Sequence, residues 1–225
     1  MQVSTAVATP SPRSMRARDK LMHTAERLYA EHGFANVSIR MISEAAGQRN
    51  KSAVQYHFST RDELIQEILA RHAAAIDEHR IPMVAALEAS GEVSLREWIT
   101  CVITPNIQHH IELGTPSWYG RFLAQAVVEP SLREYAVQAN LRTPSFRRLE
   151  KLRPPRGQDR DPDLTAQYGA MIRLLIVHMC AELEGDLAGG RVAPADAEQS
   201  WRRLGEHLIT AICGLSSALL ETSHP

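Results

Sequence analysis

The sequence has few aromatic residues, which make up 5% of its 225 residues. Uninterrupted runs of valine, isoleucine and threonine are also scarce, whereas alanine, leucine and arginine are plentiful. Because β-branched and aromatic residues favour strands and the plentiful ones favour helices, the composition predicts an all-α fold. A chain of this length can bury a core large enough to fold without disulfide bonds.

Cysteine is rare as well, with three residues far apart in the sequence and no C-x-x-C pair. This pattern excludes a disulfide scaffold and the usual zinc-binding spacings. His109 and His110 stand near Glu112, but adjacent histidines point to different faces of a helix and no fourth ligand is evident. We therefore expect buried thiols in a reducing cytoplasm, no metal site and no cofactor.

Long apolar runs and the common catalytic motifs are both missing. Apolar runs such as Leu174 to Val177 are far shorter than the roughly 20 residues that a membrane helix requires. Residues 1–15 lack a continuous apolar segment and are rich in Ser, Thr and Pro, which indicates a disordered N-terminal tail rather than a secretory signal. The chain also has no GxSxG, Walker, HExxH or dinucleotide-binding motif, so no enzyme activity is indicated.

Charge is balanced over the whole chain but uneven along it. The formal net charge is −1, yet residues 1–61 contain nine Lys or Arg against four Asp or Glu, and the remainder carries a net −6. Because the N-terminal quarter of the chain is basic and the rest is acidic, we expect an N-terminal domain that binds a polyanion, joined to a second domain with a different function. The same charges could also form an ordinary solvated surface.

Three helices are predicted in the basic quarter. Apolar spacing predicts the first over Arg16–His32, ended by Gly33, which suits a left-handed terminator. Ser38 can cap a second helix that stops at Gly47, and a short third helix fits Lys51–His57. Two short helices joined by a glycine-containing turn form a helix-turn-helix.

Further helix starts are marked by local capping patterns. Capping boxes predict starts at Thr60–Glu63, Ser94–Glu97 and Ser131–Glu134. Proline at a first helical position predicts starts at Thr115–Pro116 and Asp161–Pro162.

The interior of this region carries three more signals. Pro82 falls inside the long helix that opens at Thr60 and predicts a kink or break near Ile81. Residues 151–163 are rich in Pro, Gly and charge and predict an exposed loop. Two strongly periodic helices follow, and around Leu174 to Val177 the apolar positions encircle the first of them, which favours packing against a second copy of the chain.

Residues 17–69 contain the strings AERLYAEHGFANVSIRMISEAAG, then AVQYHF, then STRDELIQEIL. With these strings, the segment resembles the TetR family of bacterial transcriptional regulators. The resemblance implies a three-helix DNA-binding head with its connecting helix over residues 16–80 and a larger helical ligand-binding and dimerisation domain over residues 81–225. In the family, the body dimerises through its last two helices, and repression is the common mode of regulation.

The third helix of the head is expected to lie in the major groove of DNA, with Val54 and Phe58 on its inner face. Gln55 can pair with adenine, Lys51 can donate to guanine and the Ala53 methyl can pack on thymine. Other polar residues nearby suit phosphate contacts, although Tyr56 could instead close the core of the head. The residues predicted to contact DNA are Ser38, Arg40, Arg49, Asn50, Lys51, Ser52, Ala53, Gln55, Tyr56, His57 and Arg61.

Most large side chains outside the head fall between residues 80 and 190, which predicts a mostly apolar cavity for a small effector. Each of them is also an ordinary candidate for the core. The predicted ligand-binding residues are Trp98, Trp118, Tyr119, Phe122, Phe146, Tyr168, Met171 and His178. The predicted dimerisation residues are Leu175, Met179, Trp201, Leu204, Leu208, Ile212 and Leu215.

These features predict a ligand-responsive, sequence-specific DNA-binding regulator. We expect a homodimer that binds an inverted-repeat operator, acts as a repressor and is released by a small apolar or amphipathic effector. Two alternatives belong to other classes: an all-helical enzyme, and a helical interaction module whose basic head binds acidic protein or membrane surfaces. Salt dependence together with site selectivity distinguishes the regulator from both.

Overall fold

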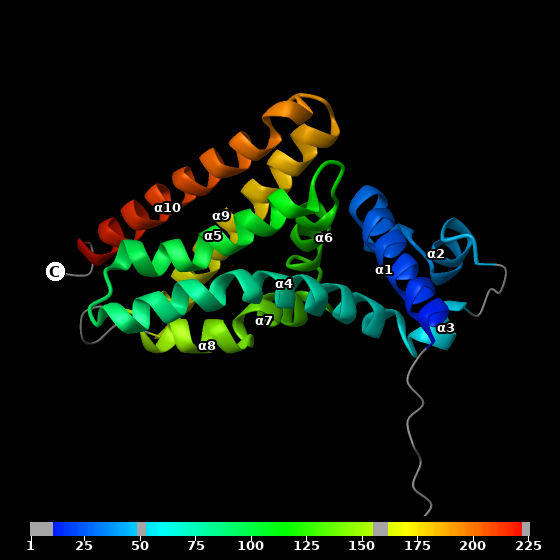
Figure 1. The fold of residues 1–225 in the computed structure, drawn as a ribbon, viewed down its shortest axis with the longest axis horizontal. Coiled ribbons are helices and arrows are strands. Elements are labelled where there is room, and N and C mark those ends of the chain that lie inside the picture. The colour runs from blue at the N-terminus through cyan, green and yellow to red at the C-terminus, as the bar shows by residue number, and fades with distance from the viewer. Residues whose placement is uncertain (1–10, 49–52, 155–161, 222–225) are drawn as a thin grey trace, which may run out of the picture. The chain divides into compact units, whose positions relative to one another are not determined.

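The computed structural model describes residues 11–48, 53–154 and 162–221, and these ranges contain helices and no strand (Figure 1). The predicted all-α fold is therefore confirmed. The chain forms two compact units, residues 1–68 and 69–225, which we call the head and the body. Their boundary lies within one continuous helix, α4 (Arg61–Ser90), and precedes the predicted boundary after residue 80.

The head consists of three short helices and the first turns of α4. Its elements are α1 (Pro12–His32), η1 (Phe34–Asn36), α2 (Ile39–Ala45) and α3 (Ala53–His57). Helix α1 begins at Pro12 rather than Arg16, because the Ser11 hydroxyl accepts the Ser14 N–H and so caps it. Residues 1–10 of the predicted tail lie outside the described residues.

Three predicted helix boundaries in the head are confirmed, whereas the predicted start of the third helix at Lys51 lies outside the described residues. Gly33 follows α1 with φ 82°, a left-handed value that costs glycine little, and its N–H donates to the Tyr29 carbonyl. The Ser38 hydroxyl caps α2 by accepting the Met41 N–H. At the start of α4, Thr60 accepts the Glu63 N–H at 3.0 Å, as the capping box predicts.

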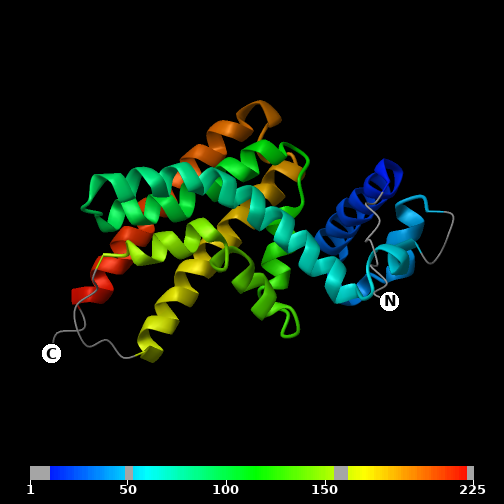
Figure 2. The same cartoon turned by 60° about the horizontal axis from the view of Figure 1, so that its bottom comes forward.

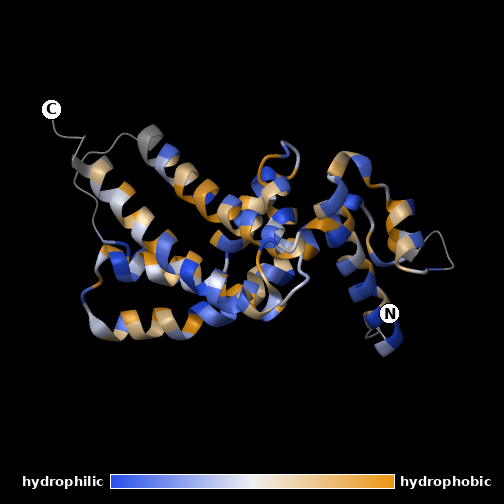
Figure 3. Ribbon diagram, turned by 90° about the horizontal axis from the view of Figure 1, so that it is seen from above, coloured by the Kyte–Doolittle hydropathy of each residue, from blue (hydrophilic) through white to orange (hydrophobic). Residues whose placement is uncertain are grey.

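The body contains the rest of α4 and six further helices among its described residues (Figure 2). They are α5 (Leu95–Leu113), α6 (Tyr119–Ala126), α7 (Arg133–Leu141), α8 (Pro144–Lys151), α9 (Pro162–Ala188) and α10 (Ala197–Glu221), with a short η2 (Pro194–Asp196) before α10. Helix α5 runs beside α10, and α6 packs on α9. Hydrophobic and hydrophilic residues are interspersed along these helices (Figure 3).

Two helix starts in the body were predicted correctly. Ser94 and Glu97 form the complete capping box at the start of α5. Helix α9 begins at Pro162, where the Asp161–Pro162 pattern places it. The predicted loop over 151–163 is described only in part, since residues 155–161 lie outside the described ranges.

One other predicted start is wrong, and another helix begins in the predicted segment without the predicted capping box. Helix α6 begins at Tyr119 rather than near Pro116, because its first N–H groups are capped by a distant carboxylate, that of Glu184 on α9. Helix α7 begins at Arg133 with no side-chain cap, and the hydroxyl of Ser131 turns to Glu129 instead.

Helix α4 continues through Pro82, so the predicted break does not occur. An internal proline costs a helix roughly 3 kcal/mol. Ile76 and Val84, on either side of Pro82, are fully buried, and their packing offsets that cost.

The core of the body gathers apolar side chains from α4, α5, α9 and α10. Close helix contacts support it: a Cβ added at Gly120 of α6 would lie 3.2 Å from the Cys180 carbonyl oxygen of α9. Cys101 and Cys180 are buried, as expected, whereas Cys213 is half-buried. Within the described ranges, no helix combines the length and apolarity needed to span a bilayer.

Candidate functional site

The α3 helix of the head has one buried and one exposed side. Val54 and Phe58 are each 1% exposed, which confirms the predicted inner face. Tyr56 is 80% exposed, so it does not close the core of the head. Its ring meets His57 edge-on at 5.0 Å between centroids. Burial, and then the positive charge of Arg18, lower the pKa of His57, so this imidazole is neutral near pH 7.

The residues predicted to contact bases lie partly outside the described ranges. Residues 49–52, which include four of the predicted DNA contacts, are not described. Ala53 and Gln55 lie on α3, whose backbone is helical from Ala53 to His57. Their contacts with DNA stay predictions.

Helix α2 places an exposed cation near α3. The Arg40 side chain is exposed and donates to Glu44 at 2.7 Å, and this hydrogen bond raises the pKa of Arg40. A DNA phosphate would have to compete with Glu44 for this guanidinium. Ser38 already uses its hydroxyl as the cap of α2, and it is also exposed.

Arg61 points into the head, which differs from its predicted phosphate contact. Its Nε donates to the Tyr29 hydroxyl at 3.3 Å, and its Nη2 donates to the Phe34 carbonyl. The guanidinium also lies over the Tyr29 ring, 5.4 Å from its centroid. Arg61 therefore braces the start of α4 against α1 and η1, because this aromatic pair offers both an acceptor and a π face.

The body contains a cavity of about 390 Å³, to which helices α4 to α9 all contribute. Much of its wall is apolar. The apolar lining includes Val102, Leu123, Val127, Val137, Ile172 and Ile176. The polar lining includes Arg80, Asn106, His110, Asn140, Arg153 and Arg173.

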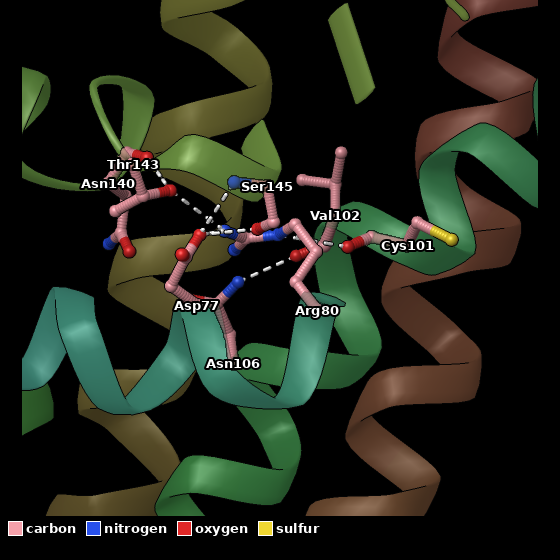
Figure 4. A network of polar contacts seen from close by, with 8 residues as sticks. All are labelled: Asp77, Arg80, Cys101, Val102, Asn106, Asn140, Thr143 and Ser145. Atoms are coloured by element: carbon pink, nitrogen blue, oxygen red, sulfur yellow. Dashed lines mark hydrogen bonds and ion pairs between the residues drawn. The ribbon is translucent and has the colours of Figure 1, made fainter. Parts of the chain in front are cut away.

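Arg80 of α4 is the centre of a polar network beside the cavity (Figure 4). It is 1% exposed, and its Nε donates to the Cys101 carbonyl at 3.2 Å. Its Nη1 lies 3.5 Å from the Thr143 hydroxyl and 3.8 Å from Oδ1 of Asp77. Asp77 in turn accepts the Ser145 N–H and hydroxyl. Burial lowers the pKa of Arg80, and the negative charge of Asp77 opposes that shift.

Stacked rings form another part of the cavity wall. His110 stacks on Trp201 with 4.4 Å between centroids, and Tyr119 stacks on His72 at 3.9 Å. Burial lowers the pKa of His110 to about 3, so its ring is neutral at physiological pH. Among the described residues, no group of three or more His, Cys, Asp or Glu is arranged to hold a metal ion.

The comparison with protein families concerns the head. The family described as "Bacterial regulatory proteins, tetR family" matches residues 21–68. Those residues hold most of α1, all of α2 and α3 and the start of α4. Residues 21–68 are therefore similar to the TetR family.

A curated relative and several solved structures are similar to the chain. The HTH-type transcriptional repressor AcnR of Corynebacterium efficiens is 29% identical over 73 residues, which are 32% of this chain and 38% of the repressor. A TetR-family regulator of Marinobacter aquaeolei covers 86% of this chain and 96% of its own at 14% identity, with a TM-score of 0.48. PfmR of Thermus thermophilus covers 90% and 97% at 19% identity, with a TM-score of 0.49.

The cavity in the body brings together part of the predicted ligand-binding set. Trp98, Tyr119 and Phe146 line it. The others do not: Phe122 and Tyr168 are buried elsewhere, Trp118 is half-buried, and Met171 and His178 are exposed on α9. Aromatic content alone was therefore an incomplete guide to the cavity.

The polar lining of the cavity was missed by the sequence analysis, which searched for large apolar side chains. One signal was available on α5, where Val102, Asn106 and His110 recur every four residues and so share a helix face. All three line the cavity. The arginines gave no such signal, since a charged residue on a helix is usually solvated.

The predicted dimerisation residues divide into two groups. Trp201, Leu204, Leu208 and Ile212 are buried in the core of a single chain, so they stabilise the body fold and are not free for a partner. Helix α9, in contrast, presents an apolar face. Met171, Leu174 and Met179 are each at least 39% exposed, while Leu175 of α9 and Leu215 of α10 are half-buried.

Proposed function

We propose that this protein is a sequence-specific, DNA-binding transcriptional regulator that acts as a repressor in the cytoplasm. The helix-turn-helix of α2 and α3 carries this proposal, because α3 buries Val54 and Phe58 while keeping its opposite side accessible. That arrangement lets a short helix enter the major groove without disturbing the core of the head. The similarity of residues 21–68 to the TetR family supports the same proposal and favours a regulator over the enzyme alternative.

The proposal includes a homodimer on an inverted-repeat operator. The exposed apolar residues of α9 lie at i, i+3 and i+8, so they share one face of that helix. A two-fold dimer through this face would present two α3 helices to half-sites one DNA turn apart, roughly 34 Å, or a multiple of that distance. A single head would contact one half-site only.

The cavity supports a ligand-responsive mechanism. Its volume of about 390 Å³ and its mostly apolar wall suit a small molecule. One helix, α4, supplies Arg61 to the head and Arg80 to the cavity wall. Through this shared helix, an effector that prefers a conformation with low DNA affinity would release the operator, and operator DNA would lower effector affinity by the same factor.

The direct test is selection of bound fragments from random DNA by the full chain. We expect a recovered inverted repeat, with binding that weakens steeply with salt yet remains site-selective. Binding without sequence preference would instead favour the helical interaction module.

Replacing Lys51 and Gln55 together by alanine is expected to remove the preference for the operator. Both residues are predicted to read base edges, and each good base contact contributes about 1–3 kcal/mol of discrimination. The measurement is the ratio of operator affinity to random-DNA affinity, obtained by fluorescence anisotropy. The Arg202→Ala variant, at an exposed position on α10, is the control and should retain the full ratio. An unchanged ratio in the double variant would remove these two residues from the recognition surface.

A further inference from the structure

The cavity wall contains buried polar atoms that have no hydrogen-bond partner among the described residues. They are Nδ1 of His110, Oδ1 of Asn140, Nε of Arg153 and Nε of Arg173. Buried polar atoms are nearly always paired in folded proteins, and an unpaired one costs free energy. Because these atoms gather around one cavity, a molecule with hydrogen-bonding groups that binds there can pair them.

The cations of this wall are not equally compensated. Arg80 has Asp77 as its counter-charge, and Arg153 has Glu150 at 2.7 Å. In the described part of the chain, Arg173 of α9 has no carboxylate within 4.0 Å. Burial, and then repulsion from Arg133, lower the pKa of Arg173. Among the described side chains, the cavity wall therefore holds one cation in excess of its nearby anions.

The rest of the cavity wall can contact the apolar part of a ligand. Leu123 of α6 and Ile172 and Ile176 of α9 line the cavity, and α9 is also the helix that carries Arg173. Trp98 of α5 also lines the cavity, and its indole N–H donates to the Leu149 carbonyl at 2.9 Å. The guanidinium of Arg153 lies over the Trp98 ring, with its Cζ 4.5 Å from the ring centroid, so this part of the wall is a cation–π contact.

We propose that the effector of this protein is an amphipathic anion, whose carboxylate or phosphate group binds Arg173 and whose apolar part packs against the hydrophobic wall. The inference rests on the proposed ligand-responsive function and names the chemical class of its ligand. An anion pairs the excess cation and gives the Arg173 Nε–H an acceptor. A neutral ligand would leave the charge of Arg173 unpaired, and a cationic ligand would add repulsion in a site of low polarity.

The test uses four ligands with the same ten-carbon chain: decanoate, decyl phosphate, 1-decanol and decylamine. Isothermal titration calorimetry with the full chain at pH 7.5 measures each affinity below the concentration at which the ligand aggregates. We expect the anions to bind at least about tenfold more tightly than decanol, and decylamine to bind most weakly. The preferred anion, carboxylate or phosphate, then identifies the head group.

The Arg173→Gln variant tests the assigned cation. It is expected to weaken binding of the preferred anion by about tenfold or more and to leave decanol affinity nearly unchanged. Arg147→Gln is the matched control, because it removes the same charge from an exposed position on α8 outside the cavity, and it should bind the anion like the parent chain.

Three results would overturn the inference: equal affinity for anion and amine, equal loss of decanoate and decanol affinity in Arg173→Gln, or no binding of either anion. DNA selection is measured separately on the same preparation. A chain that selects an operator but ignores the anions disproves this ligand class alone. A chain that binds the anions but selects no DNA site disproves the proposed regulator instead.

Discussion

Replacing Arg80 by methionine is expected to destabilise the body by about 3–5 kcal/mol, the usual loss when one partner of a buried ion pair is removed. Methionine keeps much of the side-chain volume, so the loss comes mainly from charge and hydrogen bonding. Arg80 is 1% exposed and bonds to the Cys101 carbonyl of α5 and the Thr143 hydroxyl before α8. Its removal also leaves the buried Asp77 without its cation.

Urea unfolding followed by tryptophan fluorescence measures this change in the body alone. All three tryptophans, Trp98, Trp118 and Trp201, belong to residues 69–225, so the signal is independent of the head. The Arg148→Met variant is the control. Arg148 pairs with Glu88 at 3.0 Å, but both side chains are well exposed, and the pair should contribute far less than the buried one.

A double variant separates the electrostatic loss from a loss of packing. Combining Arg80→Met with Asp77→Asn removes the uncompensated charge while keeping an oxygen that can accept from Ser145. We expect the double variant to recover more than about 1 kcal/mol of the loss, since a buried pair can often be replaced by neutral groups at little cost. A double variant as unstable as the single one would show that packing around Arg80, rather than its charge, holds these helices together.

The sequence predicted the elements whose causes are local. Gly33, Ser38 and Ser94 act within three or four residues of themselves, and all three end or begin helices where the pattern indicated. The start of α6 was mistaken because its cap comes from Glu184, which lies 64 positions beyond Gly120. A contact over that distance leaves no periodic trace in the sequence.

The cavity could be predicted in location but not in chemistry. Trp98, Tyr119 and Phe146 were identified from their size, and they do line it. Arg80 and Arg173 were not, because a helical arginine is normally solvated and only the folded chain shows which ones turn inward. Trp201 shows the converse: its strong periodicity suggested a subunit contact, yet it packs on His110 within one chain.

The largest effect on DNA binding is expected from the exposed face of α9. Met171 and Leu174 are 47% and 39% exposed, so replacing both by aspartate should leave the fold of one chain intact. In the proposed dimer these two carboxylates would be buried between apolar surfaces, which is strongly unfavourable. We expect the double variant, Met171→Asp with Leu174→Asp, to be monomeric in sedimentation velocity experiments in which the parent chain is dimeric.

Loss of the dimer should reduce operator affinity by about 100-fold or more. When two heads are joined, binding of the second half-site becomes intramolecular, and the gain is typically 10²–10⁴. Fluorescence anisotropy with the selected operator measures the loss. Tyr135→Asp, a change at a residue 49% exposed on α7, places one carboxylate on a different helix and should leave the dimer and its affinity unchanged.

The outcomes for the α9 double variant distinguish which part of the proposed dimer is wrong. If the α9 variant stays dimeric, the subunits meet through another surface, and the exposed apolar face of α9 needs a different explanation. If it becomes monomeric but binds the operator as tightly as the parent, each head selects its site alone. The proposed coupling through α4 would then have to act within one chain, on the conformation of a single head, rather than on the spacing between two heads.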